Sequence, residues 1–250
     1  MDFENIIVSK EDNVTTITIN RPEILNALDK KTLGELSDAI EGVGKDDDTR
    51  ALIITGSGRG FCSGADFKSG SADVPKFHEI IKGLTRLEKP VIASLNGAAT
   101  GAGCDIALAC DIRIASEDAR FSEIFVKRAL APDAGHYFLP RLVGVGKAKE
   151  LIFTGDIIDA KEAEQIGLVN KVVPPEDLEG ATKELATRLA MGPTKAIGMA
   201  KIAINKALES DLDSSLDYTL SATNTLMKTK DFREGVAAFL QKRKPKFRGK

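Results

Sequence analysis

The fold is decided by two glycine-rich stretches, Gly58-Arg59-Gly60-Phe61-Cys62-Ser63-Gly64-Ala65-Asp66 and Asn96-Gly97-Ala98-Ala99-Thr100-Gly101-Ala102-Gly103-Cys104-Asp105. Each stretch follows an apolar run that we predict to be a buried strand, Ala51–Thr55 before the first and Val91–Leu95 before the second. Glycine and alanine leave the backbone N–H groups open to an approaching group. Two such turns can direct two N–H donors at one oxygen, which is how an oxyanion hole is built. Taken singly, each could equally be an ordinary tight turn between a strand and a helix.

The composition limits the possible classes of function. The chain has 250 residues, of which 42% are hydrophobic, and this is enough for one domain with a sizeable core. Its formal net charge of -2 creates no overall field that favours nucleic acid. We therefore expect no nucleic-acid partner.

The cysteines and histidines indicate the cellular compartment and whether a metal ion could be bound. Cys62, Cys104 and Cys110 are odd in number and lie in apolar surroundings, which predicts reduced thiols and a cytoplasmic location. His78 and His136 are the two histidines, and no spacing in the chain is typical of a metal site. We predict no metal centre, and from the hydropathy pattern we expect neither a signal peptide nor a membrane span.

Strand and helix signals alternate up to about residue 122. Val14–Ile19 has the β-branched content and alternation of a strand. Apolar residues at helical spacing follow a possible N-cap at Asp29. Further elements are expected as helices near Phe77–Leu87 and Gly103–Ala109 and as a strand at Asp111–Ala115. Repeated strand–helix–strand units indicate a stacked α/β core.

The second part of the chain is predicted to be mostly helical. Helical spacing dominates from Ala148 onward, and the last helix is expected at Phe232–Lys242. No proline- or serine-rich linker separates the two parts. A helical tail without a linker favours packing on its own core or on a neighbouring subunit.

Asp105 is the polar exception in a segment that is otherwise apolar all round. Such a helix, over residues 101–110, is predicted to be buried. A buried carboxylate needs hydrogen-bond donors or a raised pKa. Asp105 could satisfy N–H groups in the first turn of its own helix, or it could belong to an active site.

A third stretch, Phe125–His136, contains a second candidate carboxylate. Pro132-Asp133-Ala134-Gly135 is typical of a turn. Asp133 taken alone is ordinarily a turn former or a helix cap. His136 could line a pocket or form a local hydrogen bond.

Together these stretches resemble the crotonase superfamily, the enoyl-CoA hydratase/isomerase enzymes. The resemblance extends over essentially the whole chain, from Asn20–Leu28 to Asp231–Arg243. It implies an α/β fold with a crotonase-like spiral of ββα units over residues 1–195 and a C-terminal helical trimerisation region over 196–250. It also implies homotrimers that usually pair into homohexamers, an acyl-CoA thioester substrate, and no cofactor other than the coenzyme A of that substrate.

The resemblance further assigns roles to particular residues. It implies that the amides of Ala65 and Ala102 stabilise a thioester enolate. The residues it implies for shaping the adenine and pantetheine side are Asn26, Ala27, Leu28, Ser63, Gly64 and Asp66. Phe239 and Lys242 on the last helix are implied to approach the nucleotide, of the same chain's substrate or of a neighbouring subunit's. Lys242 could instead belong to a solvated basic tail.

The catalytic carboxylates depart from the hydratase pattern. Hydratases of the superfamily carry two glutamates over the substrate, and here these positions hold Asp105, which is shorter, and Phe125, which cannot accept a proton. The resemblance places Phe125 among the substrate-binding residues. Addition of water normally uses both carboxylates. The setting of Asp133 resembles the branch of the 1,2-epoxyphenylacetyl-CoA isomerases, where an aspartate at this place is the base. One carboxylate suffices for a 1,3-proton shift, so the resemblance implies an enoyl-CoA isomerase.

Three other functions stay open at this point. A hydratase (a lyase), or a hydrolase of unusual acyl-CoAs, could use Asp105 and Asp133 as a pair. RNA binding occurs in a superfamily member whose early helix is rich in lysine, whereas Thr32–Asp48 in this chain is rich in acidic residues. A non-catalytic homologue is the third possibility, against which the two intact turns argue.

Overall fold

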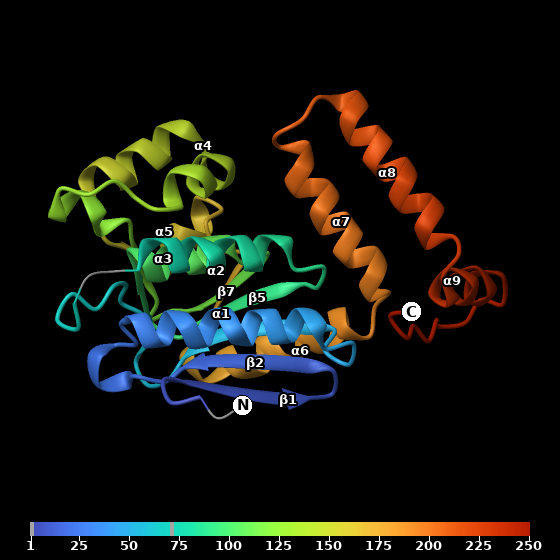
Figure 1. The fold of residues 1–250 in the computed structure, drawn as a ribbon, viewed down its shortest axis with the longest axis horizontal. Helices are drawn as coiled ribbons and strands as arrows, with labels where there is room; N and C mark the ends of the chain where they lie inside the picture. Colours follow the sequence, from blue (N-terminus) through green and yellow to red (C-terminus); the bar gives the residue numbers. More distant parts are fainter. Residues whose placement is uncertain (1–2, 71–72) are drawn as a thin grey trace.

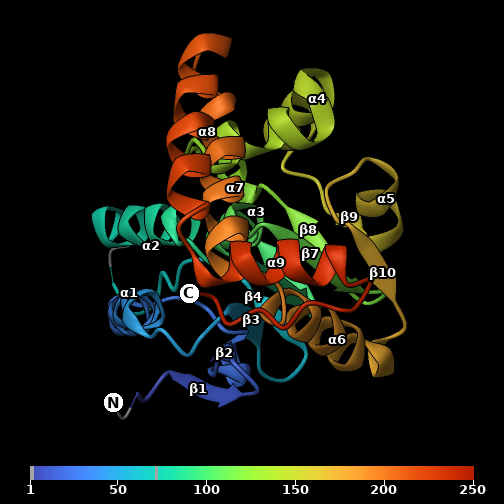
Figure 2. The ribbon, with the colours of Figure 1, turned by 90° about the vertical axis from the view of Figure 1, so that its right-hand side faces the viewer.

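The structure is a computed structural model that describes residues 3–70 and 73–250. Its core consists of two β-sheets with helices on both sides, and a group of C-terminal helices extends from one end (Figures 1 and 2). The α/β class predicted from the sequence is therefore confirmed.

The larger sheet forms the centre of the molecule. Its strands follow the order β1 (Ile6–Glu11), β2 (Val14–Ile19), β3 (Ala51–Gly56), β5 (Val91–Leu95), β7 (Ile112–Ser116) and β10 (Lys171–Val173). The pair β1–β2 is antiparallel, and the other neighbours are parallel. Strands β3 and β5 are apolar along almost their whole length because helices cover both faces of the sheet at this point.

The smaller sheet runs in the order β4 (Gly60–Cys62), β6 (Ala98–Thr100), β8 (Arg120–Ser122) and β9 (Ile158–Asp159). Strands β4, β6 and β8 are parallel, and β9 is antiparallel to β8. Each of three successive units thus gives its first strand to the larger sheet (β3, β5, β7) and its second to the smaller (β4, β6, β8). This repetition brings the ends of β4, β6 and β8 to one edge.

Helices cover both faces of the larger sheet. The helices up to residue 190 are α1 (Lys30–Lys45), α2 (Val74–Arg86), α3 (Ala102–Ala109), α4 (Gly135–Thr154), α5 (Ala160–Gln165) and α6 (Leu178–Ala190), with short 3-10 turns at η1 (Pro22–Ile24), η2 (Ile124–Arg128) and η3 (Pro175–Asp177). Alternate residues of β3 point to opposite cores: Leu52 and Ile54 join the main core, and Ala51 and Ile53 join the core against α6.

The predicted elements agree closely with those of the structure. The side chain of Asp29 accepts a hydrogen bond from the Thr32 N–H at 2.7 Å, so it is the N-cap of α1 as expected. The sequence analysis did not predict β1, five of whose six residues are exposed. It also missed the short strands β4, β6, β8, β9 and β10, because two or three residues are too few to show alternation.

The C-terminal helices form a separate layer at one end. They are α7 (Thr194–Ala207), α8 (Leu212–Leu226) and α9 (Lys230–Leu240), and Figure 1 shows them in orange and red at the opposite end from α4. Lys201 attaches α7 to the core: its Nζ donates to the Leu84 carbonyl at 2.7 Å and lies 2.9 Å from Asp111 Oδ2. Within the described residues, no helix is long and apolar enough to cross a membrane.

We predict that Lys201→Met lowers the free energy of unfolding by about 3 kcal/mol, because it leaves Asp111 without its cation and the Leu84 carbonyl without its donor. Lys195→Met, at an exposed position of the same helix, serves as the matched control. Chemical denaturation measures both. Equal stability of the two variants would contradict this role of Lys201.

Candidate active site

Two backbone turns meet at the ends of β4 and β6. Cys62 at the end of β4 pairs with Ala99 of β6, so the segments that follow the two strands start side by side. A Cβ built on Gly64 would lie 2.8 Å from the Thr100 carbonyl oxygen and 3.4 Å from the Ala102 nitrogen. The Thr100 hydroxyl also donates to the Ser63 carbonyl at 3.0 Å. The parallel pairing therefore places the two predicted amide-bearing turns against each other.

The two amides are not used by the fold. Leu28 and Ala65 form an isolated parallel bridge, in which the Leu28 N–H donates to Gly64 and the Asp66 N–H donates to Leu28. That bridge leaves the N–H of Ala65 itself free. Over residues 3–70 and 73–250, neither the Ala65 nor the Ala102 N–H has a protein acceptor. Ala102 is the first residue of α3, so its N–H also lies at the positive end of a helix.

The Gly101-Ala102-Gly103 triplet has a steric explanation. Gly101 has φ +53° and ψ -125°, which a residue with a Cβ rarely adopts. A Cβ on Gly103 would lie 2.1 Å from the Cys62 carbonyl oxygen. Ala102 is not among the non-glycine residues of positive φ. An alanine is therefore tolerated at the middle position, and its N–H remains a donor.

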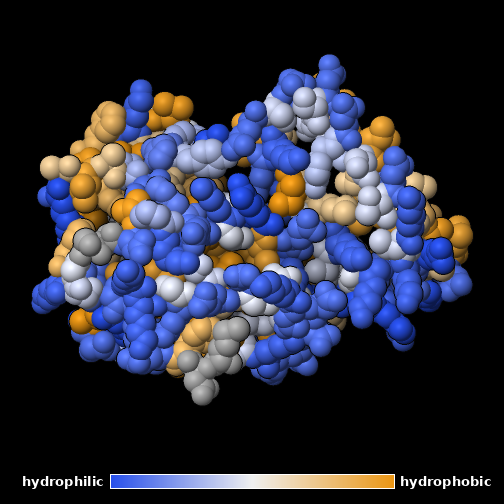
Figure 3. All heavy atoms as spheres, viewed as in Figure 1, coloured by the Kyte–Doolittle hydropathy of each residue, from blue (hydrophilic) through white to orange (hydrophobic). Residues whose placement is uncertain are grey.

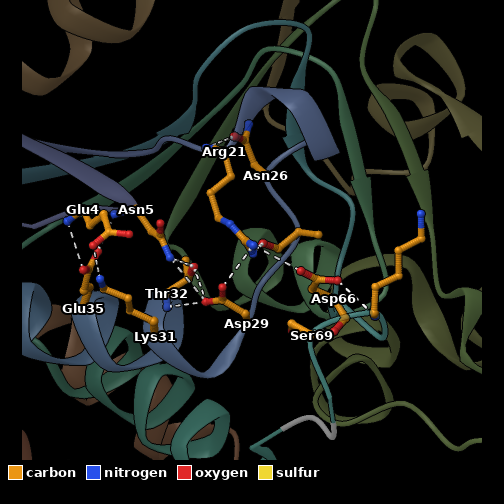
Figure 4. Close-up of polar contacts among 12 residues, drawn as sticks. Glu4, Asn5, Arg21, Asn26, Asp29, Lys31, Thr32, Glu35, Asp66 and Ser69 are labelled. Atoms are coloured by element: carbon orange, nitrogen blue, oxygen red, sulfur yellow. Dashed lines mark hydrogen bonds and ion pairs between the residues drawn. The ribbon is translucent and has the colours of Figure 1, made fainter.

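Arg21 holds the loop predicted to shape the coenzyme A side. Its guanidinium lies between two carboxylates, 3.0 Å from Asp29 Oδ2 and 3.2 Å from Asp66 Oδ2 (Figure 4). The same group donates to the Ala27 carbonyl at 2.6 Å. The arginine thus ties residues 27–29 to the turn that carries the Ala65 amide.

Asn26 acts on the same loop from inside the protein. It is fully buried, with φ +58°. Its side-chain amide donates to the carbonyls of Ser57 at 2.9 Å and Gly60 at 2.7 Å, and its oxygen accepts from the Arg21 N–H at 2.9 Å. Asn26 therefore orients the predicted binding loop through backbone groups, and its own side chain is not free for a ligand.

Three carboxyl groups gather where α4 begins. Asp133 immediately precedes this helix, and its side chain is 26% exposed. Asp105 on α3 is fully buried, and its Oδ2 accepts a hydrogen bond from the Ala134 N–H at 3.2 Å. Glu123 follows β8 and is 3% exposed. The structure therefore brings Asp105 and Asp133 together as the sequence suggested and adds Glu123, which the sequence analysis missed.

Glu123 could have been identified from its position directly after a strand of the smaller sheet. Ser122 at the end of β8 pairs with Thr100 at the end of β6, so Glu123 emerges at the same edge as the two amide turns. Functional groups of parallel sheets gather at the carboxyl ends of strands. A three-residue strand is too weak a pattern to predict, and for that reason Glu123 was not singled out.

Asp133 also faces a histidine. His78 on α2 places its Nε2 3.5 Å from Asp133 Oδ1, and its side chain is 45% exposed. The sequence analysis did not predict this contact, because His78 belongs to an ordinary amphipathic helix. His136 lies on the other side of the turn, with its Nδ1 3.2 Å from the Pro132 carbonyl, which agrees with the local hydrogen bond considered for it.

Phe125 borders the second amide turn. A Cβ on Gly101 would lie 3.8 Å from the Phe125 ring, so the ring packs beside the residue that precedes Ala102. An apolar side chain therefore lies where the superfamily resemblance implies a second glutamate in hydratases. Phe239 and Lys242 are not part of this arrangement within one chain, since α9 lies at the far end of the molecule from α4 (Figures 1 and 2).

Burial controls the electrostatics of the inner carboxyls. Burial, and secondarily the charge of Glu123, raises the pKa of Asp105 well above its ordinary value. Burial likewise raises the pKa of Glu123 from 4.5 to about 7. In the described parts of the chain, no three histidine, cysteine or acidic side chains are arranged to hold a metal ion. The arrangement can bind an oxyanion at two amides and move a proton at a neighbouring carboxylate.

Comparisons with known proteins show what this chain is similar to. A family model described as enoyl-CoA hydratase/isomerase matches residues 9–250. The chain is 41% identical to a crotonyl-CoA hydratase of Syntrophomonas wolfei, covering 99% of each, and 38% identical to a 1,2-epoxyphenylacetyl-CoA isomerase of Escherichia coli, covering 99% of this chain and 100% of that protein. A crystal structure of an enoyl-CoA hydratase from Bacillus anthracis superposes with a TM-score of 0.95 at 38% identity, covering 99% and 100% of the two chains.

We predict that Gly135→Ala destabilises the fold only when Glu123 is present. A Cβ at residue 135 would lie 2.4 Å from Glu123 Oε2, and its three nearest atoms all belong to this carboxyl group. Chemical denaturation should show a loss of about 1–3 kcal/mol for Gly135→Ala alone. Most of that loss should disappear in the Glu123→Ala background. An equal loss in both backgrounds would contradict the contact.

Proposed function

The chain belongs to the enoyl-CoA hydratase/isomerase family, and from that premise we propose that it is an enoyl-CoA isomerase with Asp133 as its base. Of the three carboxyl groups at the site, Asp133 is the partly exposed one, whereas Asp105 and Glu123 are buried. This difference in access is the observation that carries the proposal. A substrate carbon can approach Asp133 without any rearrangement of the core.

In the proposed reaction, the thioester oxygen of a 3-enoyl-CoA accepts hydrogen bonds from the N–H groups of Ala65 and Ala102. Asp133 takes a proton from C2, and the electron pair of that C–H bond spreads over the conjugated system onto the thioester oxygen. The two amides stabilise the resulting dienolate. Protonated Asp133 then returns the proton to C4, which leaves the double bond between C2 and C3. No water is added, and the only coenzyme in this scheme is the coenzyme A of the substrate.

Hydration of a 2-enoyl-CoA is the alternative function. The relatives include proteins named as hydratases and one named as an isomerase. Hydration by this chain would need Asp105 as the partner of Asp133, and Phe125 offers no proton beside the second turn. Assays with 2-enoyl-CoA alone and with 3-enoyl-CoA alone distinguish the two activities. We expect isomerisation of the 3-enoyl substrate to be faster than hydration of the 2-enoyl substrate.

We predict that Asp133→Asn lowers kcat for isomerisation by at least about a hundredfold, because the amide keeps the size of the side chain but cannot accept the proton. The Michaelis constant should change little, because the coenzyme A loops lie apart from this carboxylate. Asp105→Asn serves as the comparison and should cost less. Near-normal isomerisation by Asp133→Asn, together with loss of activity in Asp105→Asn, would identify Asp105 as the base.

We predict that Ala65→Pro lowers kcat by about two to three orders of magnitude while the protein remains folded. Proline removes an N–H that makes no hydrogen bond to the described residues, so the bridge between Leu28 and the turn can persist. Ala65→Ser, which keeps the N–H, is the control for the side chain. Full activity of a folded Ala65→Pro enzyme would remove this amide from the mechanism.

We further propose that three or six copies of the chain assemble through the C-terminal helices. Figure 3 shows apolar residues gathered over α8 and α9 at one end of the molecule. Leu212, Leu216 and Leu220 repeat every four residues along α8 and are exposed, and Phe239 on α9 is 82% exposed. In this assembly, Phe239 and Lys242 approach the nucleotide of a neighbouring subunit's substrate. The buried, unpaired cysteines suit the cytoplasm that we propose as the compartment.

We predict a solution mass of three or six times the 26.8 kDa chain. Replacing both Leu216 and Leu220 by glutamine should shift the mass toward that of a single chain, because buried apolar contacts are exchanged for polar groups. Light scattering at micromolar concentration measures both proteins. A native protein that stays at the mass of one chain would contradict the assembly.

A further inference from the structure

Two neighbouring carboxyl groups have unpartnered oxygens inside the protein. Within the parts of the chain that the structure describes, the buried side-chain nitrogen and oxygen atoms without a hydrogen-bond partner are Asp105 Oδ1 and both carboxyl oxygens of Glu123. Buried polar atoms are nearly always paired. All the exceptions therefore belong to one pair of residues, which lies directly behind the turn that carries Asp133.

The surroundings of this pair can hold one negative charge but not two. Asp105 has a donor, since its Oδ2 accepts from the Ala134 N–H at the start of α4, where the helix dipole also favours a negative charge. The Glu123 carboxyl group lies against the backbone of Gly135, and the donor that the described residues place beside it is the weak S–H group of Cys104. A second buried charge beside the first would cost several kcal/mol.

Among the described titratable groups around Glu123, none carries a positive charge that would offset a negative charge on its carboxylate. A small cavity beside it is lined by Cys104, Phe121, Ser122, Leu139, Leu151, Ile158 and Leu168. The titratable neighbours are Cys104 and Asp105 of α3 and Asp133 before α4, and none of them is a cation. Burial also raises the pKa of the Cys104 thiol, so this group stays neutral.

We propose that Glu123 is a protonated positioning residue, whose carboxyl O–H is donated to Asp105 Oδ1 so that the two acids share one proton. This shared proton fills the vacant acceptor of Asp105 and holds that carboxylate beneath Ala134, and through Ala134 it fixes the direction of Asp133. The inference rests on Asp133 being the base. It assigns to Glu123 no contact with the substrate.

The sign of the pH dependence follows from the direction of the shift. Glu123 has a folded-state pKa of about 7 against an ordinary value of 4.5, so the folded protein binds more protons than the unfolded chain between these values. The contribution of this group to stability is fully present below pH 4.5 and is lost as the pH rises through about 7. Above that pH, the Glu123 carboxyl group has lost its proton.

Glu123→Gln and Glu123→Leu separate the shared proton from simple packing. Glutamine can donate an N–H to Asp105 but cannot ionise, whereas leucine fills the space without donating. Glu117→Gln, at an exposed site between β7 and β8, is the matched control. Thermal unfolding of all four proteins is measured at about pH 5.5 and about pH 8.5. Infrared spectra over the same range detect a protonated carboxyl C=O band.

We expect the melting temperatures of Glu123→Gln and the native protein to agree at the lower pH. At the higher pH the variant should melt at least about 3 °C above the native protein. The native protein should show a carboxyl band that disappears with a midpoint near pH 7, and this titration should be absent from Glu123→Gln and unchanged in Glu117→Gln. A pH-independent difference in melting temperature, or no such band, would overturn the shared proton.

Turnover tests the positioning role. Glu123→Gln should keep kcat within about threefold, and Glu123→Leu should lower it at least about tenfold with little change in KM. Equal turnover by the two variants would show that packing alone matters and would overturn this role. The melting and infrared measurements need no substrate, so they test the shared proton even if the protein is not an isomerase. The isomerase proposal is tested separately, by comparing the rates with 2-enoyl-CoA and 3-enoyl-CoA.

Discussion

The parallel pairing of β4, β6 and β8 is the constraint on which the site depends. Each of these strands has only three residues, yet their register aligns Cys62 with Ala99 and Thr100 with Ser122. Three segments distant in the sequence therefore leave the sheet at one edge. The first two carry the free amides, and the third carries Glu123 and leads to Asp133. The larger sheet determines this pairing, because β3, β5 and β7 precede the three short strands in the same order.

Two kinds of polar group lie at this edge of the smaller sheet. The amides are backbone groups held by the fold, so no side chain has to be ordered for them to act as the proposed oxyanion hole. The carboxyl groups are held at different depths, with Asp133 partly exposed and Asp105 and Glu123 enclosed. Enclosure raises the pKa of the two inner carboxyl groups. The proposed base is the carboxyl group that a substrate can reach, and the proposed shared proton lies behind it.

The sequence predicted the parts of this molecule that have long or unusual patterns. The bounds of β2 and β5 were predicted correctly, and the two amide turns were identified because glycine and alanine concentrate there. Asp133 came from the resemblance to a family, since an aspartate in a turn is ordinarily structural. Glu123 and His78 could not be found, because their importance depends on which segments the short strands and α2 bring together. The spacing of apolar residues along one helix or strand predicts which of its faces is buried. It does not predict which other element packs against that face.

The structural role of Asn26 illustrates the same limit. The residue lies in the loop that the resemblance assigns to the coenzyme A side, yet its side chain is fully buried and bonded to backbone groups of two other segments. Arg21, which the sequence analysis did not select, makes the ion pairs that hold this loop against the Ala65 turn. A motif can therefore predict a binding loop without telling which of its side chains are free to contact a ligand.

The central claim is that one thioester oxygen lies between the Ala65 and Ala102 amides while Asp133 reaches the acyl carbons. A crystal structure with a non-reactive acyl-CoA analogue tests it most directly. The account predicts that the carbonyl oxygen accepts hydrogen bonds of about 2.7–3.1 Å from both amides and that Asp133 is the carboxylate nearest to C2 and C4. A carbonyl oxygen bound elsewhere, or Asp105 nearest to those carbons with Asp133 turned away, would contradict it.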